Sequence, residues 1–169
     1  RLRNQPEKKE SEHYRQAMRR AEATGRPDCL AAGQRQLGDL LMYTHSYAES
    51  VSWLSLALQG FERLGDATGL SRTMDRMTFA LFRQGAYAQA LTMGRRHLAL
   101  ATDSGDRSAM SIALNHIGLV HLNTGRLEAA LDHLRRALRT AEEAGDRQCM
   151  LHAANNLGWA SGRGADHVQ

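Results

Sequence analysis

Aromatic residues, prolines and long apolar runs are scarce in this sequence, and each shortage excludes a class of protein. Aromatic residues are 5% of the chain, which argues against a β-sandwich. Only 2 prolines are present, so long helices are not interrupted. No apolar run approaches the roughly 20 residues that a membrane span needs, and the start, RLRNQPEKKESEHY, lacks the apolar region of a signal peptide. We therefore expect a cytoplasmic protein without a membrane partner.

The net charge of +4 lies entirely in the first part of the chain. Residues 1–26 contain eight Lys or Arg and four Glu, which gives +4, whereas residues 27–169 contain fourteen Arg and fourteen Asp or Glu. The body therefore has no electrostatic footprint for nucleic acid, and nucleic-acid contact through the N-terminal segment stays an alternative. Only two of the 22 basic residues are lysine, a bias that favours a GC-rich bacterial source.

The sequence repeats itself at an offset of forty residues. The offset aligns four glycines and, further along each block, four apolar residues: Gly25, Gly65, Gly105, Gly145; Leu37, Met77, Ile117, Leu157. Self-similarity at a period of this size indicates a solenoid of stacked repeats. We divide the chain into a basic helix at 1–24, full repeats at 25–64, 65–104 and 105–144, and a partial repeat at 145–169.

Each repeat has the apolar spacing of two helices, which we name helix A and helix B. Apolar residues recur at steps of three and four in RSAMSIALNHIGLVHL and again in RLEAALDHLRRALRTAEEAG, and the turn NTGR separates the two stretches. We expect helix B at 47–64, 87–104 and 127–144, and about seven helices in all. Residues 7–24 match only a helix B.

A Gly-Asp pair marks the end of each repeat. Gly145 can leave helix B through a positive φ without the Cβ penalty, and Asp146 can then cap the next helix A. The first junction differs, because Pro27 occupies the first helical position. Inside a repeat, Gly118 and Ala130 are expected to let the two helices approach closely.

The pattern Leu114, Ile117, Gly118, His121 and Ala130, Leu134, Ala137 resembles the tetratricopeptide repeat family. The resemblance implies an all-α solenoid of helix-turn-helix repeats in a right-handed superhelix, with units of forty residues instead of the usual 34. The forty-residue variety is similar to the arrays of large bacterial regulators, including the Streptomyces antibiotic regulatory protein class. The chain is then expected to be a piece of a longer protein.

In this family the A helices line a concave groove that holds a protein or peptide. The resemblance places these residues in the groove: Arg35, Tyr43, Arg72, Asp75, Phe79, Phe82, Arg83, Asn115, Leu119, Asn123, His152, Asn155, Trp159. Amides suit a peptide backbone because they both donate and accept hydrogen bonds, and arginines suit carboxylates. The alternative for these positions is a merely solvated polar face.

No constellation for catalysis, cofactor binding or metal binding is recognisable. His116 and His152 could approach each other, but no carboxylate or cysteine accompanies them at ligand spacing. Cys29 and Cys149 occupy the same repeat position three units apart, so we expect two small buried thiols and no disulfide.

These observations predict a non-enzymatic scaffold or sensor module that binds a protein or peptide, within a larger bacterial regulator of transcription or signalling. A surface built from stacked repeats suits binding better than acid–base chemistry. The main alternative is self-association through exposed repeat ends, which would give a homo-oligomer.

Overall fold

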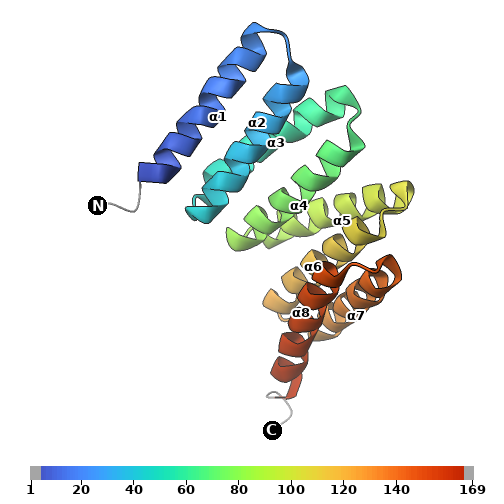
Figure 1. Ribbon diagram of the computed structural model, residues 1–169. Coiled ribbons are helices and arrows are strands. Elements are labelled where there is room, and N and C mark those ends of the chain that lie inside the picture. Colours follow the sequence, from blue (N-terminus) through green and yellow to red (C-terminus); the bar gives the residue numbers. More distant parts are fainter. Residues whose placement is uncertain (1–4, 166–169) are drawn as a thin grey trace. The chain divides into compact units, whose positions relative to one another are not determined.

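The computed structural model describes residues 5–165, and the side chains of residues 12–163. This part of the chain is all-α and contains eight helices, one more than the sequence predicted: α1 (Gln5–Ala23), α2 (Pro27–Tyr43), α3 (Tyr47–Leu64), α4 (Ala67–Arg83), α5 (Tyr87–Ser104), α6 (Arg107–Asn123), α7 (Leu127–Ala144), α8 (Arg147–Ala165) (Figure 1). The predicted bounds of the three B helices, α3, α5 and α7, are confirmed.

The chain divides into two compact units, residues 1–84 and 85–169. Unit 1 contains α1 to α4 and unit 2 contains α5 to α8, so the division falls inside the predicted repeat 65–104. Within unit 1, α2 packs against α3, and α1 packs on α2. Within unit 2, α6 packs against α7, and α8 packs against both.

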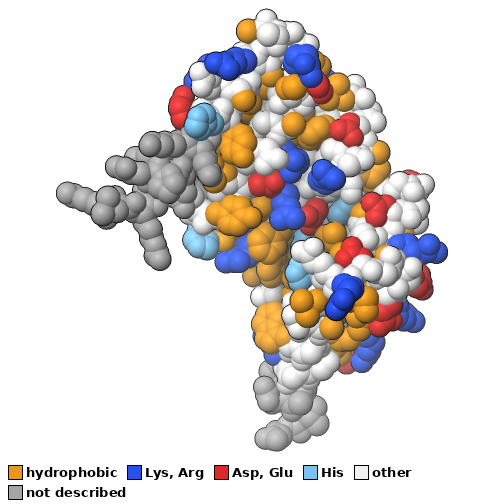
Figure 2. Space-filling model, viewed as in Figure 1, with side chains coloured by type: hydrophobic (Ala, Val, Ile, Leu, Met, Phe, Trp, Pro, Cys, Tyr) orange, Lys and Arg blue, Asp and Glu red, His pale blue; other side chains and the backbone are white. Residues whose placement is uncertain are grey.

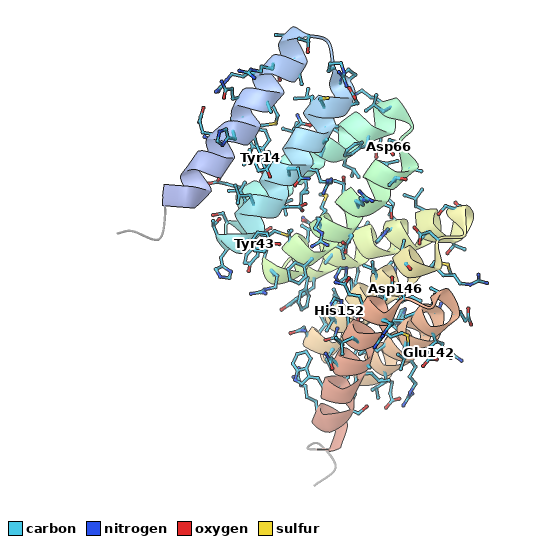
Figure 3. All side chains as sticks on the ribbon, in the orientation of Figure 1. Tyr14, Tyr43, Asp66, Glu142, Asp146 and His152 are labelled. Carbon is cyan, nitrogen blue, oxygen red and sulfur yellow. The ribbon has the colours of Figure 1, made fainter. Side chains whose placement is uncertain are left out.

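The Gly-Asp pairs end one helix and begin the next, as predicted. Gly65, Gly105 and Gly145 follow the B helices with φ between 65° and 69°, in the left-handed region that glycine enters without a Cβ penalty. Asp66 then accepts a hydrogen bond of 2.9 Å from the amide of Gly69, and Asp146 accepts bonds of 3.1 Å from the amides of Gln148 and Cys149 (Figure 3). The bond from Cys149 is the main reason why the pKa of Asp146 lies below its usual range.

The two complete hairpins use the same close contact between helix A and helix B. A Cβ added to Gly38 of α2 would lie 2.7 Å from Cγ of Leu54, and one added to Gly118 of α6 would lie 2.8 Å from Cγ of Leu134. Both leucines are fully buried. The predicted close approach at Gly118 is therefore confirmed, with Leu134 as the main contact beside the backbone oxygen of Ala130, 3.3 Å away.

The first hairpin differs from the others at the turn between its two helices. Gly85 and Gly125 take positive φ values of 82° and 75° there, whereas His45 takes φ 60° at the matching position. His45 is the one non-glycine residue with a positive φ in the described part of the chain. A non-glycine residue in this backbone region lowers the stability by an amount of order 1 kcal/mol or more, so His45 makes the turn less stable than glycine would.

The two cysteines do not share the same environment. Cys149 is buried as predicted, but Cys29 is exposed, so the prediction of two buried thiols is wrong for Cys29. Cys29 lies in the first turn of α2, where Asp28 and Pro27 are also exposed. Neither cysteine forms a disulfide. None of the described helices is both long and apolar enough to cross a membrane.

Candidate functional site

In unit 1 the two A helices, α2 and α4, contact each other, and seven of the predicted groove residues lie on them. Arg35, Asp75, Phe79 and Phe82 are half-buried, and the others are exposed: Tyr43, Arg72, Arg83. We name this surface the α2–α4 face. Figure 2 shows acidic and basic side chains intermingled with apolar ones in this region.

The middle of the α2–α4 face carries a cluster of two arginines and two aspartates. Arg35 donates to Asp39 of the same helix at 2.9 Å, and Arg76 pairs with Asp75 at 3.0 Å. Burial raises the pKa of Asp39, and the charge of Asp75 adds to the rise, whereas Arg35 and Arg76 oppose it. Oδ1 of Asp39 is buried and has no hydrogen-bond partner in the described part of the chain. Every cation of this cluster therefore already has a carboxylate.

A second cluster, which we name the Arg83 cluster, lies where α4 ends and α3 begins. The guanidinium of Arg83 lies over the ring of Tyr47, 5.3 Å from its centroid, and 5.7 Å from that of Phe79. Nδ1 of His45 is 2.7 Å from the hydroxyl of Tyr47, and the two rings meet edge-on. Two rings and a hydrogen bond thus hold an exposed arginine in place.

Tyr43 completes this end of unit 1. It is the last residue of α2 and precedes the turn that contains His45 (Figure 3). Its side chain is 79% exposed, the highest fraction among the exposed large hydrophobic residues of the described chain. An aromatic ring of this exposure is free to contact a partner.

In unit 2 the A helices α6 and α8 contact each other, and they carry the remaining predicted groove residues. Asn115 is 9% exposed, and its side-chain oxygen accepts a 2.9 Å hydrogen bond from Nδ2 of Asn156. Asn155 and His152 are exposed and Leu119 is half-buried. A peptide on this α6–α8 face would therefore meet Asn155 before Asn115.

The exposed aromatic of unit 2 is Trp159 of α8. Its side chain is 49% exposed, and the guanidinium of Arg163 lies 5.5 Å from its ring centroid. Asn123, at the end of α6, donates to the carbonyl of Leu119 at 3.0 Å. The α6–α8 face thus combines an aromatic–arginine pair with amides, whereas the α2–α4 face carries two ion pairs.

The sequence placed these residues on A helices correctly but missed several of their neighbours. Arg76, His45 and Asn156 hold the predicted residues in place and were not singled out. A forty-residue alignment finds positions that recur, whereas these contacts are made by residues that differ between repeats. The one available signal was His45, because it stands where the other two turns have glycine.

Two histidines form a separate contact on the hairpin of α6 and α7. His121 is buried, its ring centroid lies 5.2 Å from that of His133, and its Nδ1 has no hydrogen-bond partner among the described residues. Burial lowers the pKa of His121, and the charges of His133, Arg126 and Arg95 lower it further. Residues 12–163 contain no group of three or more side chains that could hold a metal ion.

Solved structures share this fold at low sequence identity. BtubC from P. vanneervenii superposes with a TM-score of 0.75 at 17% identity, over 92% of this chain and 66% of that chain. Aspartyl phosphate phosphatase F from Bacillus subtilis gives 0.74 at 17%, over 85% and 38%. A signal transduction ATPase with numerous domains and a tetratricopeptide repeat sensor, from Pyrococcus horikoshii, gives 0.67 at 17%, over 79% and 21%. The chain spans less than two thirds of each.

The sequence itself matches one family. No curated protein sequence matches the chain. The family model described as tetratricopeptide repeat matches residues 29–103 and 109–168, which is most of the sequence. The match covers α2 to α5 almost completely and then α6 to α8, the helices whose repeated hairpins are described above. The chain therefore belongs to the tetratricopeptide repeat family.

Proposed function

We propose that this chain is a protein- or peptide-binding module that uses the exposed faces of its A helices. The observation that carries the proposal is that each unit exposes one large aromatic residue in the C-terminal half of a helix A, Tyr43 in α2 and Trp159 in α8. Tyrosine and tryptophan are enriched among the residues that dominate binding energies in protein interfaces. The helices fix the backbone at both positions, so little backbone entropy is lost when a partner binds.

The polar groups around the two rings also suit a polypeptide partner. Asn155 beside Trp159 can donate to and accept from a peptide backbone, and the exposed Arg83 lies on the same unit as Tyr43. Neither face offers a recognisable nucleophile with a base, so we propose binding without catalysis.

We further propose that the module belongs to a larger regulatory protein, as its sensor or scaffold part. The support is the likeness of fold to a phosphatase of aspartyl phosphate and to the repeat sensor of a signal transduction ATPase. The likeness to that ATPase covers 21% of its length, which shows that a fold of this size can form part of a larger chain.

The proposal is tested by selecting peptides from a displayed random library on the purified chain and measuring their affinities by fluorescence anisotropy. We expect Tyr43→Ala or Trp159→Ala to weaken the selected peptides about tenfold, the loss typical of a central interface residue. Leu56→Ala is the matched control, because Leu56 is 45% exposed but lies on the B helix α3. An equal loss in Leu56→Ala, or a library without any enriched peptide, would contradict the proposal.

A second candidate is self-association of the chain through α8. Leu151 is 59% exposed, and a Cβ added to Gly158 would meet no atom within 4 Å. The equivalent glycines, Gly38 and Gly118, are in close contact with leucines of a helix B. A second copy could supply such a helix, and light scattering over a range of concentrations would then show a rising mass. A Leu151→Glu variant is expected to keep the chain monomeric.

A further inference from the structure

We infer that the Arg83 cluster of unit 1 binds the carboxylate of a glutamate or aspartate side chain in the partner, next to an apolar residue that contacts Tyr43. This inference rests on the proposed function and specifies the chemistry that the α2–α4 face selects. Three observations support it. Two aromatic rings hold Arg83, the charge of Arg83 is unpaired, and His45 of the same cluster has an unfavourable backbone conformation.

Arg83 is held by two aromatic rings. The rings of Tyr47 and Phe79 contact the guanidinium at centroid distances of 5.3 and 5.7 Å. Cation–π contacts use the faces of the aromatic rings and no hydrogen-bond acceptor. None of the described residues accepts a hydrogen bond from the Arg83 guanidinium, so its N–H groups remain available. A planar fork of N–H donors matches a carboxylate with two parallel hydrogen bonds.

The unpaired charge in the Arg83 cluster is that of Arg83 itself. Arg72, which also lacks a carboxylate among the described residues, lies eleven residues earlier on α4. Arg35 and Arg76 already pair with Asp39 and Asp75. Within residues 12–163 no carboxylate pairs with Arg83, whose side chain is exposed. One unpaired guanidinium balances the single charge of a carboxylate. A phosphate group, or the run of phosphates in a nucleic acid, would need more cations than this cluster provides.

The Arg83 cluster also contains a residue, His45, whose backbone conformation favours glycine. His45 has a φ of 60°, whereas glycine stands at the same turn position in the next two repeats. Its Nδ1 lies 2.7 Å from the hydroxyl of Tyr47, the ring that supports Arg83. His45 thereby fixes Tyr47, which in turn fixes Arg83. We assign His45 a positioning role, since residues kept in unfavourable backbone conformations cluster at ligand sites.

The apolar neighbour of the carboxylate is assigned from Tyr43. This ring is 79% exposed on the helix that leads into the His45 turn. A leucine or an aromatic residue beside the acidic residue would bury part of the Tyr43 ring. The expected partner segment is therefore an acidic residue flanked by apolar ones.

The test uses two short capped peptides in which one glutamate or one glutamine is flanked by leucines. Each is titrated into the isotope-labelled chain, and shifts of backbone amides and of the Arg83 Nε–H signal are followed by NMR. We expect the glutamate peptide to shift the Arg83 signal and to bind about tenfold more tightly than the glutamine peptide, a difference of about 1.4 kcal/mol. Arg83→Gln should abolish this preference, and Arg83→Lys should reduce it, because lysine keeps the charge but not the fork.

Two further variants separate recognition from folding. Arg63→Gln removes the same charge from the end of α3, outside the α2–α4 face, and should keep the full preference. His45→Gly should raise the melting temperature, because glycine accepts this φ, and yet weaken the preference for glutamate. A purely structural His45 would not give these opposite changes.

The outcomes are decisive for the inference and distinct from those for the proposed function. Equal binding of the two peptides, no shift of the Arg83 signal, or a preference that survives in Arg83→Gln would overturn the inference. Peptides that perturb only the α6–α8 face would overturn it while leaving the proposed binding function intact.

Discussion

The hairpins α2–α3 and α6–α7 pack their helices alike and present different chemistry on helix A. In both, a glycine of helix A meets a buried leucine of helix B, Gly38 with Leu54 and Gly118 with Leu134. Elsewhere on the same helices, α2 carries the ion pair of Arg35 with Asp39, whereas α6 carries Asn115, which is bonded to Asn156 of α8. These two hairpins therefore share the contact that holds helix A to helix B and differ in the side chains on the rest of helix A.

The largest expected effect tests whether the buried leucine contributes equally to the stability of the two hairpins. Leu54→Ala and Leu134→Ala each remove a fully buried side chain from the same position, and each should lower the free energy of unfolding by about 2–5 kcal/mol. Chemical denaturation followed by circular dichroism measures both losses. A difference of more than about 1 kcal/mol between them would show that the hairpins are not energetically equivalent.

Replacing a glycine by alanine should destabilise the chain in α6 and stabilise it in α8. In Gly118→Ala the new Cβ would lie 2.8 Å from Leu134, so overpacking of about 1–3 kcal/mol should outweigh the gain in helix propensity of about 1 kcal/mol. In Gly158→Ala nothing lies within 4 Å, so the gain alone should remain. Thermal melting of the two variants provides the comparison, and a stabilising Gly118→Ala would refute the close contact.

His121 of unit 2 and Asp39 of unit 1 should contribute to the pH dependence of stability with opposite signs. The pKa of His121 is lowered in the folded state, so its contribution to the stability of unit 2 is complete above the unfolded value of about 6.5 and is lost as the pH falls through it. The pKa of Asp39 is raised in the folded state, so the contribution of Asp39 to the stability of unit 1 increases as the pH falls through that folded value. Hydrogen exchange of the backbone amides in α6 and α2, measured over a pH series, reports the stability of each helix separately.

Matched variants identify the groups responsible for the two pH responses. His121→Leu places in α6 the residue that α2 and α4 have at this position, Leu41 and Leu81, and should remove the acid sensitivity of unit 2. Asp39→Asn should remove the stabilisation of α2 that comes from protonation of Asp39. Acid sensitivity that persists in His121→Leu would assign it to another group.

The smallest effect concerns the cysteines, which hold the same position in the first and last repeats. A thiol reagent should modify the exposed Cys29 in the native chain and leave the buried Cys149 unmodified until denaturant is added. No change of stability is expected from modifying Cys29. Rapid modification of both thiols in the native chain would show that α8 opens readily.

The helices could be predicted from the sequence because their signals are local. The Gly-Asp pairs and the apolar spacing determine where α3, α5 and α7 begin and end, and both depend on neighbouring residues only. The environment of Cys29 was not predictable in this way. Its repeat equivalent Cys149 contacts Ser108 of α6, whereas Cys29 lies on the first turn of α2 beside exposed residues.

The candidate site was predictable only in outline, because its contacts depend on residues that differ between repeats. The alignment placed Arg83 and Asn115 on helix A. It could not show that Arg83 would lie over Tyr47, or that Asn115 would be buried against Asn156. Such contacts join different helices, so they require the packed structure.

The Gly-Asp junction also bears on how a chain of this kind could change its length. The signal that ends one helix and the signal that starts the next are adjacent residues, and each acts on its own helix alone. A duplication or deletion of forty residues by unequal recombination would therefore leave every remaining junction intact. Arrays of this type could grow and shrink in evolution without first acquiring compensating mutations, and new binding faces could then diverge in the duplicated copies.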